Sequence, residues 1–97
     1  MKDAKFRKAL DAYGVEREIS FLVLDDHVYD NSIIGITDGG RLVYDYEMMI
    51  QEYMEDEGCD ELEAIEWMDE NVMRSLPYYE DAPIIIHPRS DIEEYEE

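Results

Sequence analysis

The residues best placed for chemistry are His27 and three aspartates close to it in the chain, Asp25, Asp26 and Asp30. A histidine beside carboxylates can bind a divalent metal ion or act in acid–base catalysis. The pattern has low specificity, because 27 of the 97 residues are acidic and any histidine has an acid nearby. We interpret His27 as part of a turn over 25–27, and a small metal-dependent enzyme centred on it is the third hypothesis for function.

Other catalytic and metal-binding patterns are missing. Gly39-Gly40 lacks the third glycine and the following helix of a phosphate-binding loop. Cys59 has no histidine near it in sequence, although a position at a helix N-terminus would favour its thiolate. Residues 56–60 lack the alternating acids and the final glutamate of a calcium loop. We therefore predict no enzyme, no catalytic residue, no metal site and no cofactor.

The acidic charge is concentrated in the second half of the chain. The net charge is −19, and residues 1–44 contain 8 acids and 6 bases, whereas residues 45–97 contain 19 acids and 2 bases. Such a chain repels nucleic acids and anionic membranes, which bind proteins of the opposite sign. The partner that this charge favours is a basic surface on another protein.

Two predicted helices in this half present rows of carboxylates. Residues 45–73 contain neither Lys nor Arg, although i,i+4 pairs of opposite charge would add about 0.2–0.5 kcal/mol each. The rise of an α-helix places successive carboxylates on the length scale of the phosphates in a DNA strand. We interpret the row as a partner-binding surface; a solvated helix face is the alternative. The predicted residues are Glu47, Glu55, Glu63, Glu66, Asp69 and Glu70.

Arg74, Tyr78 and Tyr79 form a further candidate contact surface just after the second of these helices. Arginine and tyrosine are enriched in interface hot spots. In the alternative interpretation, Arg74 has a structural role, because a base at a helix C-terminus interacts favourably with the helix dipole and with nearby acids.

The hydrophobic pattern predicts a single α+β domain over 1–97, with a small, mainly antiparallel sheet packed on three helices. The sheet is expected to be a three-stranded meander, with a glycine hairpin turn at 38–40, plus a C-terminal strand. Gly14 and Pro77 are expected to end the first and third helices, and the acidic tail over 90–97 is expected to be frayed. The predicted elements are a helix over 2–13, strands over 19–24, 32–37 and 41–44, helices over 45–57 and 60–76, and a strand over 83–87.

Each of the two later helices is expected to begin at an aspartate cap, Asp45 or Asp60, and to bury one apolar stripe. The bases of the first helix, Lys5, Arg7 and Lys8, are expected to pair with acids of the same molecule; a small basic patch is the alternative. The predicted stripes contain Met49, Ile50, Tyr53 and Met54 in one helix and Leu62, Ile65, Met68 or Asp69, Val72 and Leu76 in the other.

The expected compartment is the cytoplasm. The chain has one cysteine, which cannot form an internal disulfide, and its first residues lack the apolar segment of a secretion signal. No run reaches the roughly 18 apolar residues of a membrane span.

The run over 31–50 (NSIIGITDGGRLVYDYEMMI) resembles a family of small acidic proteins from phages and prophages of Firmicutes. The resemblance continues through Glu63–Trp67 and Asp69–Tyr78, ends near Ile86, and so covers most of 19–86. It implies a phage origin and supplies no active site. In size and charge the chain is also similar to anti-CRISPR and anti-restriction proteins that imitate DNA.

Two further hypotheses follow from these features. The leading one is a phage-encoded inhibitor that binds the basic nucleic-acid groove of a host nuclease or CRISPR effector by DNA mimicry. The second is a non-enzymatic interaction module, able to form a homodimer, whose acidity serves solubility. Its contacts would come from Tyr78, Tyr79 and the strand over 83–86.

Overall fold

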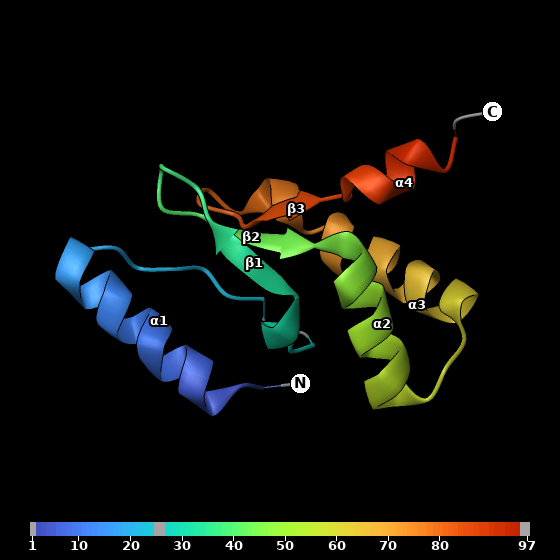
Figure 1. Ribbon diagram of the computed structural model, residues 1–97, viewed down its shortest axis with the longest axis horizontal. Helices are drawn as coiled ribbons and strands as arrows, with labels where there is room; N and C mark the ends of the chain where they lie inside the picture. The colour runs from blue at the N-terminus through green and yellow to red at the C-terminus, as the bar shows by residue number, and fades with distance from the viewer. Residues whose placement is uncertain (1, 25–26, 96–97) are drawn as a thin grey trace.

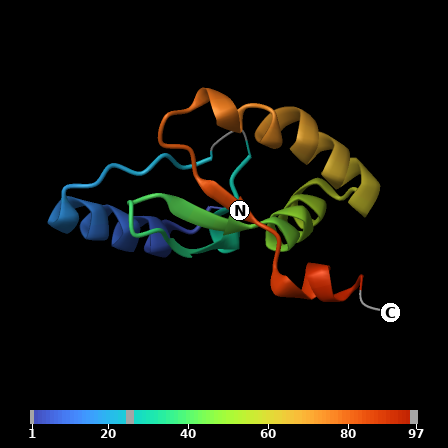
Figure 2. The same ribbon diagram turned by 90° about the horizontal axis from the view of Figure 1, so that it is seen from above.

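The computed structural model describes residues 2–24 and 27–95, and in this part of the chain it shows an α+β fold with a three-stranded sheet (Figure 1). The predicted fold class is therefore confirmed. Figure 2 shows α1 at one end of the molecule and the other α-helices at the opposite end. The helices are α1 (Ala4–Arg17), α2 (Tyr46–Glu57), α3 (Glu61–Met68) and α4 (Arg89–Glu93). The strands are β1 (Ile33–Ile36), β2 (Leu42–Asp45) and β3 (Ile84–Ile86).

The predicted hairpin forms between β1 and β2. Gly40 has a φ of 88°, which favours glycine, and its N–H donates to the Thr37 carbonyl at 3.0 Å. The antiparallel register shifts between Ile33 and Gly35, which marks a β-bulge in β1.

The C-terminal strand joins the sheet beside β2 and runs parallel to it, pairing Val43 with Ile84 and Asp45 with Ile86. The sheet is therefore mixed, with the order β1-β2-β3. The long connection through α2 and α3 allows this, because two parallel strands need a crossover of a dozen or more residues.

The predicted strand over 19–24 does not join the sheet. The Ile19 N–H donates to the Gly14 carbonyl at 2.8 Å, and the Leu24 N–H donates to the Tyr44 hydroxyl at 3.2 Å. Phe21, Val23 and Leu24 pack against the core instead of forming a strand ladder. The β-forming residues thus cover apolar surface as an extended segment. Of the predicted turn over 25–27, only His27 lies within the described residues.

The first helix does not end at Gly14 but continues to Arg17, where Glu18 takes a left-handed conformation with a φ of 58°. Gly14 is buried, and a Cβ added there would lie 2.6 Å from the Ile19 carbonyl oxygen. The glycine is needed for the close approach of the chain as it turns back along α1.

The α2–α3 hairpin follows the predicted caps. The Asp45 carboxylate accepts from the Met48 N–H at 3.1 Å, and the Asp60 carboxylate accepts from the Glu63 N–H at 2.9 Å. Gly58 ends α2 with a φ of 66°. The hairpin packs these side chains into the core: Met49, Ile50, Tyr53, Ala64, Met68 and Val72.

The helix predicted over 60–76 differs from the structure in the residues that it buries and in the position of its end. Leu62 is 65% exposed, because Ala64 occupies the inner position of the first turn of α3. A π-helical turn follows over Asp69–Met73, and Pro77 lies inside a 3₁₀ turn over Leu76–Tyr78. The wider turn lets Val72 stay buried after the α-helical period ends.

The predicted frayed tail over 90–97 is wrong for Ser90–Glu93, which belong to α4. Pro88 sits at the N-cap, and the Arg89 guanidinium pairs with Glu93 at 3.7 Å along the helix. These features favour a short helix despite the acidic composition.

An ion pair between the half-buried Arg7 and the buried Asp30 connects α1 to the chain that precedes β1. The Arg7 guanidinium donates from Nε and Nη2 to the two Asp30 oxygens, each at 2.7 Å. The Asp30 side chain is 0% exposed and also accepts from the Asp3 N–H at 2.8 Å. The expected intramolecular pairing is therefore confirmed for Arg7, whereas Lys5 and Lys8 form no ion pair among the described residues and stay exposed.

We expect Arg7→Met to lower the free energy of unfolding by about 3 kcal/mol, because it leaves a buried carboxylate without its counter-charge. Urea denaturation at pH 7 measures this change. The matched control is Lys8→Met, which removes the same charge from an exposed position of α1 and should change stability by less than about 0.5 kcal/mol. Equal losses in both variants would contradict the role given to the pair.

The difference in the free energy of unfolding between the wild type and Arg7→Met should become smaller as the pH falls from 7 to 3. Burial raises the pKa of Asp30, but the hydrogen bonds from Arg7 and Asp3 outweigh it, so this pKa lies below its ordinary value. The stabilisation by Asp30 is therefore present above pH about 4 and lost below it. In the variant, the Asp3 N–H still donates to Asp30, but the hydrogen bonds and the charge of Arg7 are lost, so protonation of the buried carboxylate relieves part of the penalty.

Candidate functional site

All six carboxylates predicted to bind a partner are exposed on the α2–α3 hairpin and the turn that follows it. The reason is the packing of Met49, Tyr53 and Met68 into the core, which leaves these six side chains in water. The six residues do not form a single track, because they are distributed around the two helices.

One row of carboxylates lines a shallow groove of about 250 Å³ along α2. Glu47, Gln51 and Glu55 share this face, as their spacing predicts. Asn31 and Met48 complete the groove beside Glu52, whose carboxylate accepts a hydrogen bond from the Ser32 hydroxyl at 2.9 Å.

The second row lines a groove of about 460 Å³ between the end of α2 and α3. Because an α-helix turns about 100° per residue, Tyr53 and Glu57 lie on roughly the opposite side of α2 from the first row. Asp69 lines neither groove; its charge acts on Tyr46, whose pKa is raised by burial and by this neighbour. The second groove is lined by Tyr53, Glu57, Cys59, Glu63, Glu66, Trp67, Glu70 and Asn71.

His27 does not meet the acid close to it in the chain. Asp30 is held by Arg7, and the His27 Nε2 atom instead lies 3.6 Å from Asp56 and 3.8 Å from Glu57 at the end of α2. The described residues contain no group of three His, Cys, Asp or Glu side chains that could hold a metal ion, and Asp25 and Asp26 lie outside them.

The surroundings of His27 are aromatic. Its ring centroid lies 4.8 Å from that of Tyr29, 5.0 Å from that of Tyr53 and 6.1 Å from that of Trp67. The side chain is 13% exposed, and its buried Nδ1 atom has no hydrogen-bond partner in the described part of the chain. The arrangement is a packed aromatic cluster with an acidic pair at its edge.

Arg74, Tyr78 and Tyr79 have different surroundings. Arg74 pairs with Glu70 at 3.2 Å, and both side chains are exposed. Tyr78 is 89% exposed, whereas Tyr79 lines a small cavity of about 30 Å³ beside His27. Arg74 therefore makes the contact with a nearby acid that its structural interpretation predicts.

Cys59 lies next to the start of α3, but its surroundings disfavour the thiolate. Burial raises the pKa of this thiol, and the charges of Glu63 and Asp60 raise it further. The acids of the first helical turn thus act against the helix N-terminus, and the thiolate expected from the sequence is not supported.

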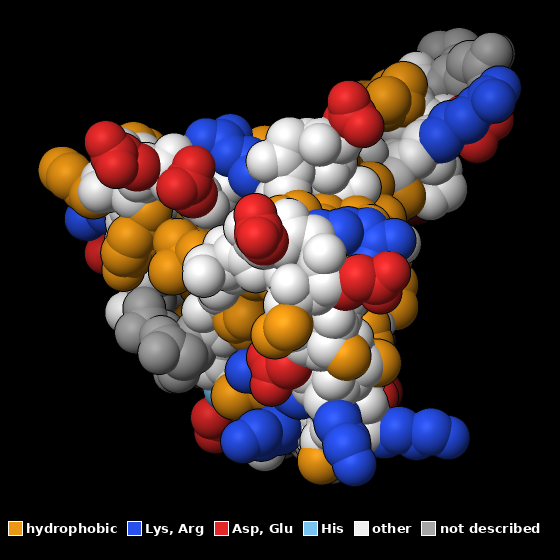
Figure 3. All heavy atoms as spheres, turned by 90° about the vertical axis from the view of Figure 1, so that its left-hand side faces the viewer, with side chains coloured by type: hydrophobic (Ala, Val, Ile, Leu, Met, Phe, Trp, Pro, Cys, Tyr) orange, Lys and Arg blue, Asp and Glu red, His pale blue; other side chains and the backbone are white. Residues whose placement is uncertain are grey.

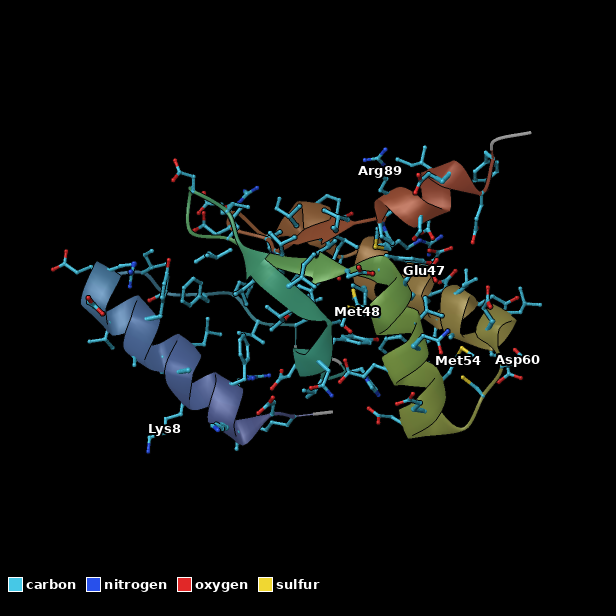
Figure 4. All side chains as sticks on the ribbon, viewed as in Figure 1. Lys8, Glu47, Met48, Met54, Asp60 and Arg89 are labelled. Carbon is cyan, nitrogen blue, oxygen red and sulfur yellow. The ribbon has the colours of Figure 1, made fainter. Side chains whose placement is uncertain are left out.

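Glu47 interacts with Asp91, a contact that the sequence pattern did not predict. Burial raises the pKa of Glu47, and so do a hydrogen bond shared with Asp91 and the charges of Asp91, Glu61 and Glu94. Figure 4 shows Glu47 at the start of α2, close to α4. Asp91 was not foreseen here because the tail was expected to be frayed.

The opposite end of the molecule carries bases. Figure 3 shows the side of the molecule on which α1 lies. Lys and Arg side chains gather along its lower edge, and exposed apolar side chains lie above them. The bases Lys5, Arg7 and Lys8 belong to α1, which lies at the end of the molecule opposite to α3 and α4 (Figure 2).

No protein-family model, curated protein or solved structure significantly matches this chain. The resemblance to small phage proteins therefore stays a prediction. None of the helices in the described part of the chain has the length and apolar character that crossing a membrane requires.

We expect Glu47→Gln to raise the midpoint of thermal unfolding at pH 7. A raised pKa means that the folded state favours protonated Glu47, so its stabilisation is present at low pH and is lost as the pH rises through the folded pKa. Glutamine has no charge to repel Asp91. The gain should therefore disappear below pH about 4.

The matched control is Glu55→Gln, which removes the same charge from the same exposed face of α2. Glu55→Gln relieves only the general repulsion of the acidic surface, so it should raise the midpoint of thermal unfolding by less than Glu47→Gln does. Equal midpoints for the two variants across the pH range would show that the contact with Asp91 is unimportant.

Proposed function

We propose that this protein is an inhibitor that binds the basic nucleic-acid groove of a host nuclease or CRISPR effector, where its carboxylates take the place of phosphates. The observation that carries this proposal is the exposure of all six predicted carboxylates on two helices, within a stretch over 45–73 that has no Lys or Arg. A surface with mixed charges would gain stability from i,i+4 pairs. The omission of those pairs supports a role for the field itself.

The distribution of the acids favours a partner that encloses the hairpin. Glu47 and Glu55 line one side of α2, while Glu63, Glu66 and Glu70 line the groove on its other side. A flat basic surface would contact only one of these rows. A cleft that normally surrounds a nucleic acid would contact both, and the strong field would also accelerate the encounter at low salt.

The role against host defence is proposed from the resemblance to phage proteins and from the similarity in size and charge to DNA-imitating inhibitors. The proposed place of action is the host cytoplasm. The lone cysteine agrees with a reducing compartment.

A second candidate is the interaction module that forms a homodimer. It is favoured by the position of β3 at an edge of the sheet, since an edge strand has unpaired backbone groups that another chain can use. The exposed side chain of Tyr78 and the partly exposed residues of β3 would form its contacts.

The test of the leading proposal is affinity capture from a Firmicutes lysate with the wild type and a six-site variant. We expect the wild type to retain a nucleic-acid-binding protein at low salt and to release it on addition of either salt or duplex DNA. The variant should capture less than a tenth as much. It carries Glu47→Gln, Glu55→Gln, Glu63→Gln, Glu66→Gln, Asp69→Asn and Glu70→Gln.

A control variant neutralises six exposed acids elsewhere and so has the same net charge. It should capture the partner nearly as well as the wild type. If both variants fail equally, total charge and not the hairpin determines binding. A partner that is indifferent to salt and DNA, or capture of the protein itself alone, would favour the interaction module. The control carries Asp11→Asn, Glu16→Gln, Glu18→Gln, Asp38→Asn, Glu80→Gln and Asp81→Asn.

A further inference from the structure

The groove between α2 and α3 has an aromatic floor. Tyr53 and Trp67 both line it, and their rings stack with centroids 4.8 Å apart and an interplanar angle of 27°. The His27 ring contacts both of them, at centroid distances of 5.0 Å and 6.1 Å. Tyr53 is buried in the core, so the floor is fixed by packing before any ligand arrives.

Four glutamates surround this floor. Glu57 comes from the end of α2, and Glu63, Glu66 and Glu70 come from α3 and the turn after it. The last three share one face with Trp67, because their spacing from Glu63 is i, i+3, i+4 and i+7. No Lys or Arg of the described residues lines the groove.

An aromatic face beside carboxylates is suited to a guanidinium group. A cation is attracted to the face of a tryptophan ring, and the flat guanidinium can stack on it while it donates to a carboxylate. A lysine ammonium is a strongly hydrated point charge and cannot stack in this way. Glu70 already accepts a guanidinium donor, from Arg74 at 3.2 Å.

We propose that the groove formed by Tyr53, Trp67 and the surrounding glutamates binds an arginine side chain of the basic partner protein. The inference rests on the proposed function and adds to it a defined anchoring point. The field of the hairpin attracts the partner, and the groove selects arginine over lysine at one position. Tryptophan and arginine are the residue types that most often dominate interface energies.

The test is a titration with an acetylated tetra-arginine peptide at low salt, compared with tetralysine and the uncharged tetracitrulline. Trp67 is the only tryptophan, so its fluorescence reports on this groove directly. We expect tetra-arginine to change the emission in a saturable way, tetralysine to bind at least about threefold more weakly, and tetracitrulline not to bind.

Variants separate the groove from the general field, with calorimetry as the measurement. Trp67→Leu keeps the net charge and should weaken tetra-arginine binding about three- to tenfold. Glu63→Gln/Glu66→Gln should weaken it more than Glu47→Gln/Glu55→Gln, which removes the same charge from the groove on the other side of α2. Thermal unfolding of each variant verifies that the fold is retained.

Several outcomes would overturn the inference. Equal binding of arginine and lysine peptides, no effect of Trp67→Leu, or equal losses in the two double variants would leave only a diffuse field. A concentration-dependent dimer that tetra-arginine dissociates would assign the groove to a base of a second copy. The proposed function fails separately, if the wild type binds tetra-arginine yet captures no protein that DNA displaces.

Discussion

The buried carboxylate of Asp30 is the constraint on which the N-terminal half of this protein depends. Its side chain has no exposure to water, so its charge must be matched inside the protein, and the Arg7 guanidinium does this with two hydrogen bonds of 2.7 Å. The pair fixes the place of α1, and from there Gly14 lets the chain turn back closely along the helix. The segment over 19–24 can then cover the core without joining the sheet.

Most of the other acidic side chains are exposed to water, and this shapes the other half. Glu52 of α2 is buried and accepts a hydrogen bond from the Ser32 hydroxyl. The α2–α3 hairpin and the turn after it bury residues such as Met49 and Met68 and leave the six predicted partner-binding carboxylates outside, where repulsion costs least. Where two carboxylates do meet, at Glu47 and Asp91, the pKa of Glu47 is raised by burial and by that contact. The contact between Glu47 and Asp91 thus opposes the ionised form of Glu47 in the folded state.

The aromatic cluster connects the two halves of the chain and relates fold to chemistry. His27 leaves its sequence neighbours and packs against Tyr53 and Trp67 of the hairpin, with Asp56 and Glu57 near its Nε2 atom. His27, the residue at the centre of the third hypothesis, therefore packs against an aromatic floor. The same packing forms the floor of the groove between α2 and α3, so the acidic surface has a defined binding site in addition to its electrostatic field.

The features that depend on neighbours in the chain could be predicted from the amino-acid sequence. The caps at Asp45 and Asp60, the turn at 38–40 and the exposure of the six predicted partner-binding carboxylates follow from local hydrogen bonding and from the helical period. The features that depend on distant partners appear only in the folded chain. They are the pairing of Arg7 with Asp30, the absence of a strand over 19–24, and the contact of Glu47 with Asp91. β-propensity and charge are properties of a single residue. A strand ladder or an ion pair also needs a second group, and the position of that group is set only in the folded chain.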